Sequence, residues 1–145
     1  MFSKPSMMTR IVVGKLTGFL LGVAGFFMLP AFGVDDMKIR IGVLFWYAAI
    51  GAFIALAGVF TRHPMLKMKM PWWCMGPLIG AWMNFLLIMF AWDVFAPWMA
   101  NGDFWGFTSP WWIVVEGAVV GLVISGLATL FGGAGPETVR ALERR

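Results

Sequence analysis

Residues 111–131, WWIVVEGAVVGLVISGLATLF, are apolar for the full length that a helix needs to cross a bilayer. A helix rises about 1.5 Å per residue, so about 20 apolar residues span the hydrocarbon core. Three runs of similar length precede this stretch: Ile11–Leu29, Ile41–Phe60 and Trp72–Phe95. We therefore predict an all-α membrane protein, a bundle of four transmembrane helices with short loops and no soluble domain.

The composition excludes an ordinary soluble domain. Of the 145 residues, 61% are hydrophobic and only 12% are charged, whereas about 25% are charged in typical soluble chains. We expect residues 1–135 to form the transmembrane domain and residues 136–145 a short charged cytoplasmic tail. The lipid bilayer is then the first partner of the chain.

Basic residues flank the apolar runs and predict the orientation of the protein. Two groups of three lie at the two ends of the chain, and a third group lies between the second and third runs. The groups are Lys4, Arg10 and Lys15; Arg62, Lys67 and Lys69; and Arg140, Arg144 and Arg145. Because loops rich in Lys and Arg stay in the cytoplasm, we expect a multi-pass protein of the cell inner membrane with both termini cytoplasmic. Basic residues that are spread in this way do not form a patch for nucleic acid.

The first run has an alternative interpretation. A basic start, an apolar stretch and Ala31-Phe32-Gly33 together resemble a secretory signal peptide with its cleavage site. The apolar stretch is longer than a usual signal core, so we expect a retained first helix. N-terminal sequencing of the mature protein distinguishes the two.

Small residues recur on one face of each of three runs. In lipid, helices associate where small residues let their backbones approach closely, as in the GxxxG motif. We predict helix packing at eight positions: Gly14, Gly18, Gly22, Gly76, Gly80, Gly117, Gly121 and Ser125. Pro77 lies inside the third run and predicts a kink there.

Three polar residues are candidates for ion or proton binding. Glu116 lies about one and a half turns inside the tryptophans that begin the fourth run, and an ionisable residue at that depth suggests a functional site. Asp93 is expected at a matching depth on the third helix, and Asn84 nearer the middle of the bilayer. Tyr47 is expected to be a packed phenol that needs one hydrogen bond.

Helical periodicity argues against a simple pair of carboxylates. Asp93 points about 180° away from the face that carries Asn84, and Glu116 about 100° from the centre of its small-residue face. We therefore favour a protein that acts by helix association, as an accessory or assembly subunit of a membrane complex or as a homo-oligomer. The alternative is a small ion or proton transporter or channel that uses Glu116 with Asp93 or Asn84.

A weaker alternative is copper handling by the methionine-rich loop, with His63, Met65, Met68 and Met70 followed by Cys74 and Met75. Thioether and thiol ligands suit Cu(I), but two lysines lie among them and the spacing is not diagnostic. No arrangement of nucleophile and base is present, so we expect neither an enzyme nor a bound cofactor or metal.

Overall fold

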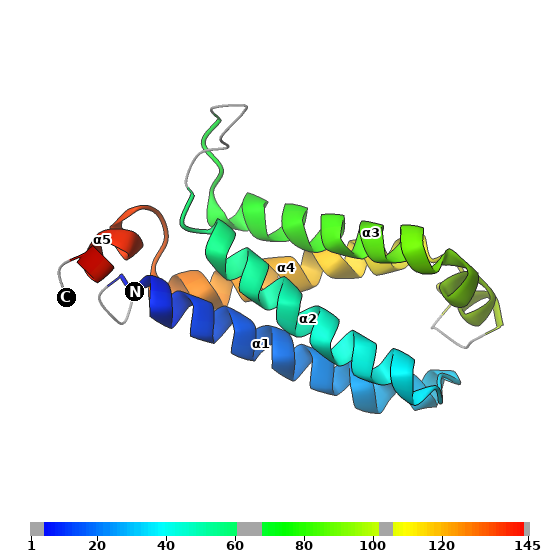
Figure 1. Cartoon of the computed structure of the whole chain (residues 1–145). Coiled ribbons are helices and arrows are strands. Elements are labelled where there is room, and N and C mark those ends of the chain that lie inside the picture. The colour runs from blue at the N-terminus through cyan, green and yellow to red at the C-terminus, as the bar shows by residue number, and fades with distance from the viewer. Residues whose placement is uncertain (1–4, 61–67, 102–105, 144–145) are drawn as a thin grey trace.

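The computed structural model describes residues 5–60, 68–101 and 106–143. Five α-helices and one short 3-10 helix account for most of these residues (Figure 1). They are α1 (Met7–Met28), η1 (Leu29–Phe32), α2 (Met37–Ala57), α3 (Trp72–Asn101), α4 (Trp111–Gly132) and α5 (Glu137–Glu143). Helices α1 to α4 are each long and apolar enough to cross a membrane, which confirms the four predicted spans.

The four long helices form two antiparallel hairpins. Helix α1 packs along α2 and helix α3 along α4, while the hairpins contact each other mainly through α1 and α4. Both termini lie at one end of the bundle, and the hairpins draw apart toward the other end (Figure 1). There Trp98 donates a 2.8 Å hydrogen bond to the carbonyl of Phe32, which links the two hairpins again.

Helix α3 differs from its predicted form at two places. It continues past Phe95, where the predicted third span ended, to Asn101. Its backbone leaves helical angles at Ala91 (φ −121°, ψ 26°) and not at Pro77. The irregularity at Ala91 was not predicted, and the kink expected at Pro77 stays a prediction, because a proline can bend a helix whose backbone angles remain helical.

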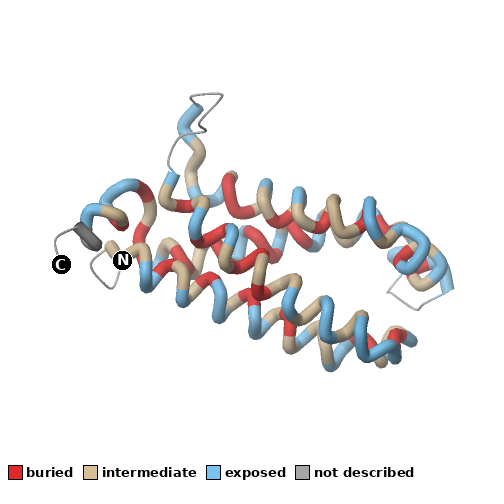
Figure 2. The backbone as a smooth tube through the Cα atoms, in the orientation of Figure 1, coloured by how far each residue is buried: buried red, intermediate tan, exposed pale blue. Residues whose placement is uncertain are grey.

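Buried residues follow the seams between paired helices, and the outward faces are apolar and exposed (Figure 2). On α1 the buried positions are Arg10, Gly14, Gly18 and Gly22, all spaced by four residues. A Cβ atom at Gly18 would lie closer than 3.0 Å to the carbonyl oxygen of Tyr47. The helices of each hairpin thus pack backbone to backbone, which requires glycine at the crossing.

Apolar side chains fill the space between the hairpins near their middle. Ile50 and Ile54 of α2 meet Val120 and Ile124 of α4, and all four are buried. After α4 the chain turns back, and the N–H of Gly135 donates to the carbonyl of Gly58 at 3.1 Å. The tail predicted for residues 136–145 carries α5, which contacts α1.

Candidate functional site

Four polar side chains from three helices meet inside the membrane-spanning part. We call them the membrane polar cluster: Trp46 and Tyr47 of α2, Asn84 of α3 and Glu116 of α4. The Tyr47 hydroxyl donates to Glu116 Oε2 at 2.5 Å, and Asn84 Nδ2 donates to the same oxygen at 2.9 Å. Trp46 Nε1 donates to Asn84 Oδ1 at 3.1 Å. The cluster therefore joins both hairpins around one carboxyl group.

Asn84 is the centre of this network and is completely buried. Its Nδ2 also donates to the carbonyl oxygen of Ile113 at 2.9 Å. An asparagine amide has two N–H donors and one oxygen, and here both donors and the oxygen are used. Asn84 is thus held in a single orientation in which its donors face the carboxyl group of Glu116.

Glycine at position 117 makes room for this arrangement. A Cβ atom there would lie 2.7 Å from Asn84 Nδ2 and 2.8 Å from Asn84 Cβ. Asn84 continues the face of Gly76 and Gly80, which lies against Gly117 and Gly121 of α4. The close packing of these glycines places the amide of Asn84 beside Glu116, the residue before Gly117.

Glu116 keeps one oxygen without a donor. Both hydrogen bonds described for its carboxyl group end on Oε2, and within the described residues no donor reaches Oε1. The side chain as a whole is exposed at the surface of the bundle, while Asn84 is enclosed. A proton on Oε1 would leave the bonds from Tyr47 and Asn84 in place, so this carboxyl can exchange a proton without dismantling the cluster.

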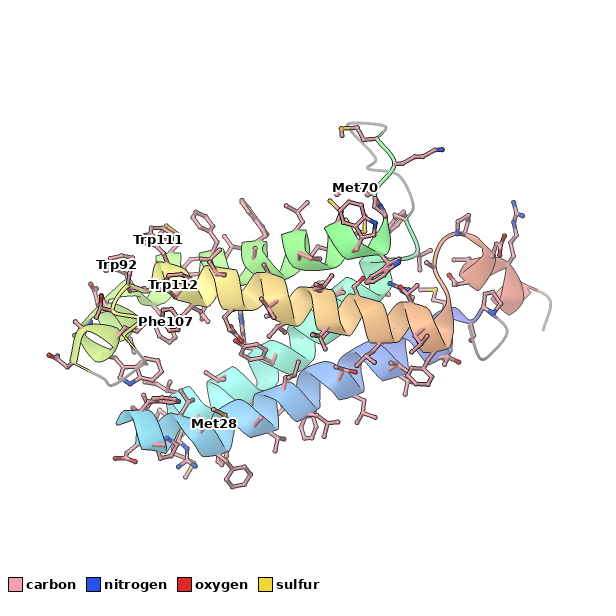
Figure 3. All side chains as sticks on the ribbon, turned by 180° about the vertical axis from the view of Figure 1, so that it is seen from behind. Met28, Met70, Trp92, Phe107, Trp111 and Trp112 are labelled. Atoms are coloured by element: carbon pink, nitrogen blue, oxygen red, sulfur yellow. The ribbon has the colours of Figure 1, made fainter. Side chains whose placement is uncertain are left out.

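Aromatic rings mark the end of α4 nearest to Glu116. Trp92, Phe107, Trp111 and Trp112 gather at that end, opposite the end where Met70 lies (Figure 3). The rings of Trp92 and Trp111 are 5.7 Å apart, and those of Phe107 and Trp112 are 4.6 Å apart. Tryptophans concentrate at the membrane interface, and Glu116 follows Trp111 by five residues, which is about 7.5 Å along a helix. We therefore expect the backbone of Glu116 to lie deeper in the membrane than these tryptophans.

Of the three predicted ion or proton ligands, the structure brings together Asn84 and Glu116. Asp93 follows the irregular residue Ala91, is exposed, and forms no hydrogen bond with another described residue. Tyr47 and Trp46 join the cluster instead. The sequence indicated that Tyr47 needs a partner, and that partner is Glu116.

The predicted packing residues lie at the helix crossings. Gly14, Gly18 and Gly22 face the backbone of α2, and Gly76 and Gly80 face that of Gly117 and Gly121. Ser125 donates to the carbonyl of Trp72 at 2.9 Å. These small-residue faces are used within the chain and are not open to another protein.

A second polar centre lies around Arg10. From the sequence, Arg10 is only one of the basic residues that flank the first apolar run. Its side chain is completely buried, and Nε donates to the carbonyl of Ala55 at 2.8 Å. Nη1 donates to Thr129 Oγ1 at 3.0 Å and to the carbonyl of Gly133. A cation is favourable at the C-terminal ends of helices, and Arg10 serves α2 and α4 in this way. The sequence contains one sign that Arg10 is buried: it lies four residues before Gly14 and therefore shares the glycine face of α1.

Copper binding by the methionine-rich loop stays a prediction, because part of that loop lies outside the described residues. They contain no group of three or more His, Cys, Asp or Glu side chains able to hold an ion. In the methionine-rich loop, residues 61–67, with His63 and Met65, lie outside the described part. Met68 is exposed, whereas Met75 is buried in α3.

Comparison with protein-family models, with curated proteins and with solved structures finds no match to this chain. The geometry of the membrane polar cluster is therefore the basis for the proposed function.

Proposed function

We propose that this four-helix membrane protein binds and releases a proton at Glu116 and thereby serves proton movement across the membrane. The observation that supports this is the carboxyl group itself. Glu116 Oε2 is held by donors from α2 and α3, while Oε1 is free of described donors on an exposed side chain. Ionisable groups inside the membrane commonly belong to proton relays.

The chemistry of the cluster favours a proton over a metal ion. A cation such as Na⁺ or Ca²⁺ needs several oxygen ligands, but Tyr47 and Asn84 present an O–H and an N–H to Glu116. The Asn84 oxygen already accepts from Trp46. A single carboxylate that accepts both described hydrogen bonds on Oε2 can take a proton on Oε1, because protonation requires only one oxygen.

We also propose that the protein works as a homo-oligomer or as a subunit of a larger membrane complex. A single bundle of four helices is barely large enough to enclose a pathway, and its glycine faces are already used internally. The exposed side of Glu116 leaves its carboxyl group accessible to a neighbouring subunit. We place the protein in the inner membrane with both termini cytoplasmic and assign it no enzymatic reaction.

Proton flux into liposomes tests this function. The protein is reconstituted with a pH-sensitive dye inside, and a potassium diffusion potential drives proton entry. We expect flux for the wild type and none above protein-free liposomes for Glu116→Gln, whose amide oxygen can still accept from Tyr47. Asp93→Asn, which alters an exposed carboxylate on α3, is the control and should retain wild-type flux. Equal flux from the wild type and Glu116→Gln would overturn the proposal.

If the isolated protein shows no flux, the same variants are compared in the complex obtained by gentle extraction from native membranes. A protein that is always extracted alone and as a monomer would argue against the proposed assembly.

A further inference from the structure

A pocket of about 570 Å³ opens at the end of the bundle that carries the termini. We call it the terminal-end pocket. Gly58, Phe60, Lys69, Trp72, Met75 and Ala134 contribute to its wall. We propose that it binds the phosphate of an anionic phospholipid headgroup.

Positive charge lies around the terminal-end pocket. Lys69 is exposed and lines it directly. Behind the wall lies Arg10, whose described acceptors are the neutral groups of Ala55, Thr129 and Gly133. No ion pair with another described residue compensates this charge, so the region favours an anion.

Arg10 also carries a side-chain donor that forms no hydrogen bond with a described residue. Its Nη2 is buried and has no hydrogen-bond partner among the described residues. A buried donor without a partner is costly and requires an explanation. Nη2 lies in the space where a Cβ atom of Gly58 would be, and Gly58 itself is part of the pocket wall. Arg10 itself does not line the pocket, so its buried guanidinium would act on the phosphate through its charge and not through a hydrogen bond.

The first turn of α3 also lies at the terminal-end pocket. Trp72 begins this helix and lines the pocket. The N–H groups of Cys74 and Met75 donate to the carbonyl of Pro71 at 3.0 Å, so the positive end of the helix dipole is what favours an anion here. Lys69 and this helix end, three residues apart in the sequence, both line the pocket, and the charge of Arg10 lies behind Gly58.

The surroundings favour a lipid over a soluble anion. Phe60, Trp72 and Met75 supply apolar wall, and the pocket lies where the transmembrane helices end. Tryptophan is typical of the headgroup level of a bilayer. A phospholipid would place its phosphate beside Lys69 and its acyl chains along the exposed apolar faces of the helices.

Native mass spectrometry of the full chain tests the proposal. The protein is extracted in detergent with equal amounts of phosphatidylglycerol and phosphatidylcholine, and the bound ratio is measured. We expect a preference for phosphatidylglycerol that Lys69→Gln lowers about fivefold, which is the typical effect of one lysine near an anionic surface. Ala134→Phe, which fills the pocket without changing charge, should lower it as well.

Lys15→Gln is the matched control, because Lys15 is exposed on α1 and does not line the pocket. It should leave the ratio unchanged. Equal retention of both lipids by the wild type, or an equal loss from Lys69→Gln and Lys15→Gln, would overturn the proposal. Displacement of the lipid by millimolar inorganic phosphate would also overturn it, because the pocket would then hold a soluble anion.

Discussion

The hydroxyl of Tyr47 on α2 lies 2.5 Å from Oε2 of Glu116 on α4, and this hydrogen bond joins the two hairpins. Elsewhere α2 and α4 contact each other far less than the two helices within either hairpin do. A polar bond in the apolar layer therefore stabilises the hairpin junction and at the same time orients the carboxyl group of Glu116.

Removing the hydroxyl tests this bond. Tyr47→Phe should lower the free energy of unfolding by about 0.6 kcal/mol and by no more than about 1.7 kcal/mol, the range measured for polar bonds between membrane helices. The double-mutant cycle with Glu116→Leu, which removes the acceptor oxygen, measures the coupling between the two side chains. Additive effects of the two substitutions would show that the residues do not interact.

Replacing the central amide should cost more. Asn84→Leu keeps a similar volume but leaves Trp46 Nε1 without its acceptor and removes the hydrogen bonds from Asn84 to the Ile113 carbonyl and to Glu116 Oε2. Each unsatisfied buried group costs about 1–3 kcal/mol. We expect Asn84→Leu to be less stable than Tyr47→Phe in denaturant titration, and the opposite order would contradict the central position of Asn84.

Glycine packing gives a prediction with a control on the same kind of helix. A Cβ atom at Gly80 would lie closer than 3.0 Å to the backbone of Gly117, whereas one at Gly42 would meet nothing within 4 Å. Gly80→Ala should destabilise the protein by about 1–3 kcal/mol, because backbone cannot move aside as a side-chain tip can. Gly42→Ala should be neutral or stabilising by up to about 1 kcal/mol, since alanine favours helix. Thermal unfolding in one detergent compares them, and equal midpoints would argue against the described α3–α4 crossing.

Arg10 is predicted to hold two helix ends in place. Arg10→Met removes its hydrogen bonds to Ala55, Thr129 and Gly133 and should lower the free energy of unfolding by about 2 kcal/mol or more, since bonds to charged groups contribute about 1.5–3 kcal/mol each. The exposed Arg140 supplies the control Arg140→Gln, which should have little effect. Unfolding measured by circular dichroism would contradict the assignment if both variants matched the wild type.

The four spans were predictable from the sequence because the thickness of the bilayer sets the length of an apolar run. The end of α3 was not predictable in the same way. The apolar run predicted a span that ends at Phe95, yet the helix continues through Pro97 to Asn101. A proline within a helix removes one N–H donor and need not end the helix.

The candidate site was predictable only in part. Angles around a helix axis placed Glu116 away from the centre of the small-residue face, and together with the direction of Asp93 this argued against a pair of carboxylates. These angles describe the direction of each Cβ atom and omit the length of a glutamate side chain. They also omit the space that Gly117 leaves for the amide of Asn84. The contact between Glu116 and Tyr47 depends on which helices are neighbours. Helical periodicity describes the faces of one helix and does not predict how the two hairpins are arranged.

Reversible protonation of Glu116 is the central claim, and infrared difference spectroscopy during a pH titration measures it most directly. The wild-type protein should show a carbonyl stretch of a protonated carboxyl group that Glu116→Gln lacks and Asp93→Asn retains. If the wild type and Glu116→Gln gave the same difference spectrum, Glu116 would not exchange a proton in this range, and the proposed function would be wrong.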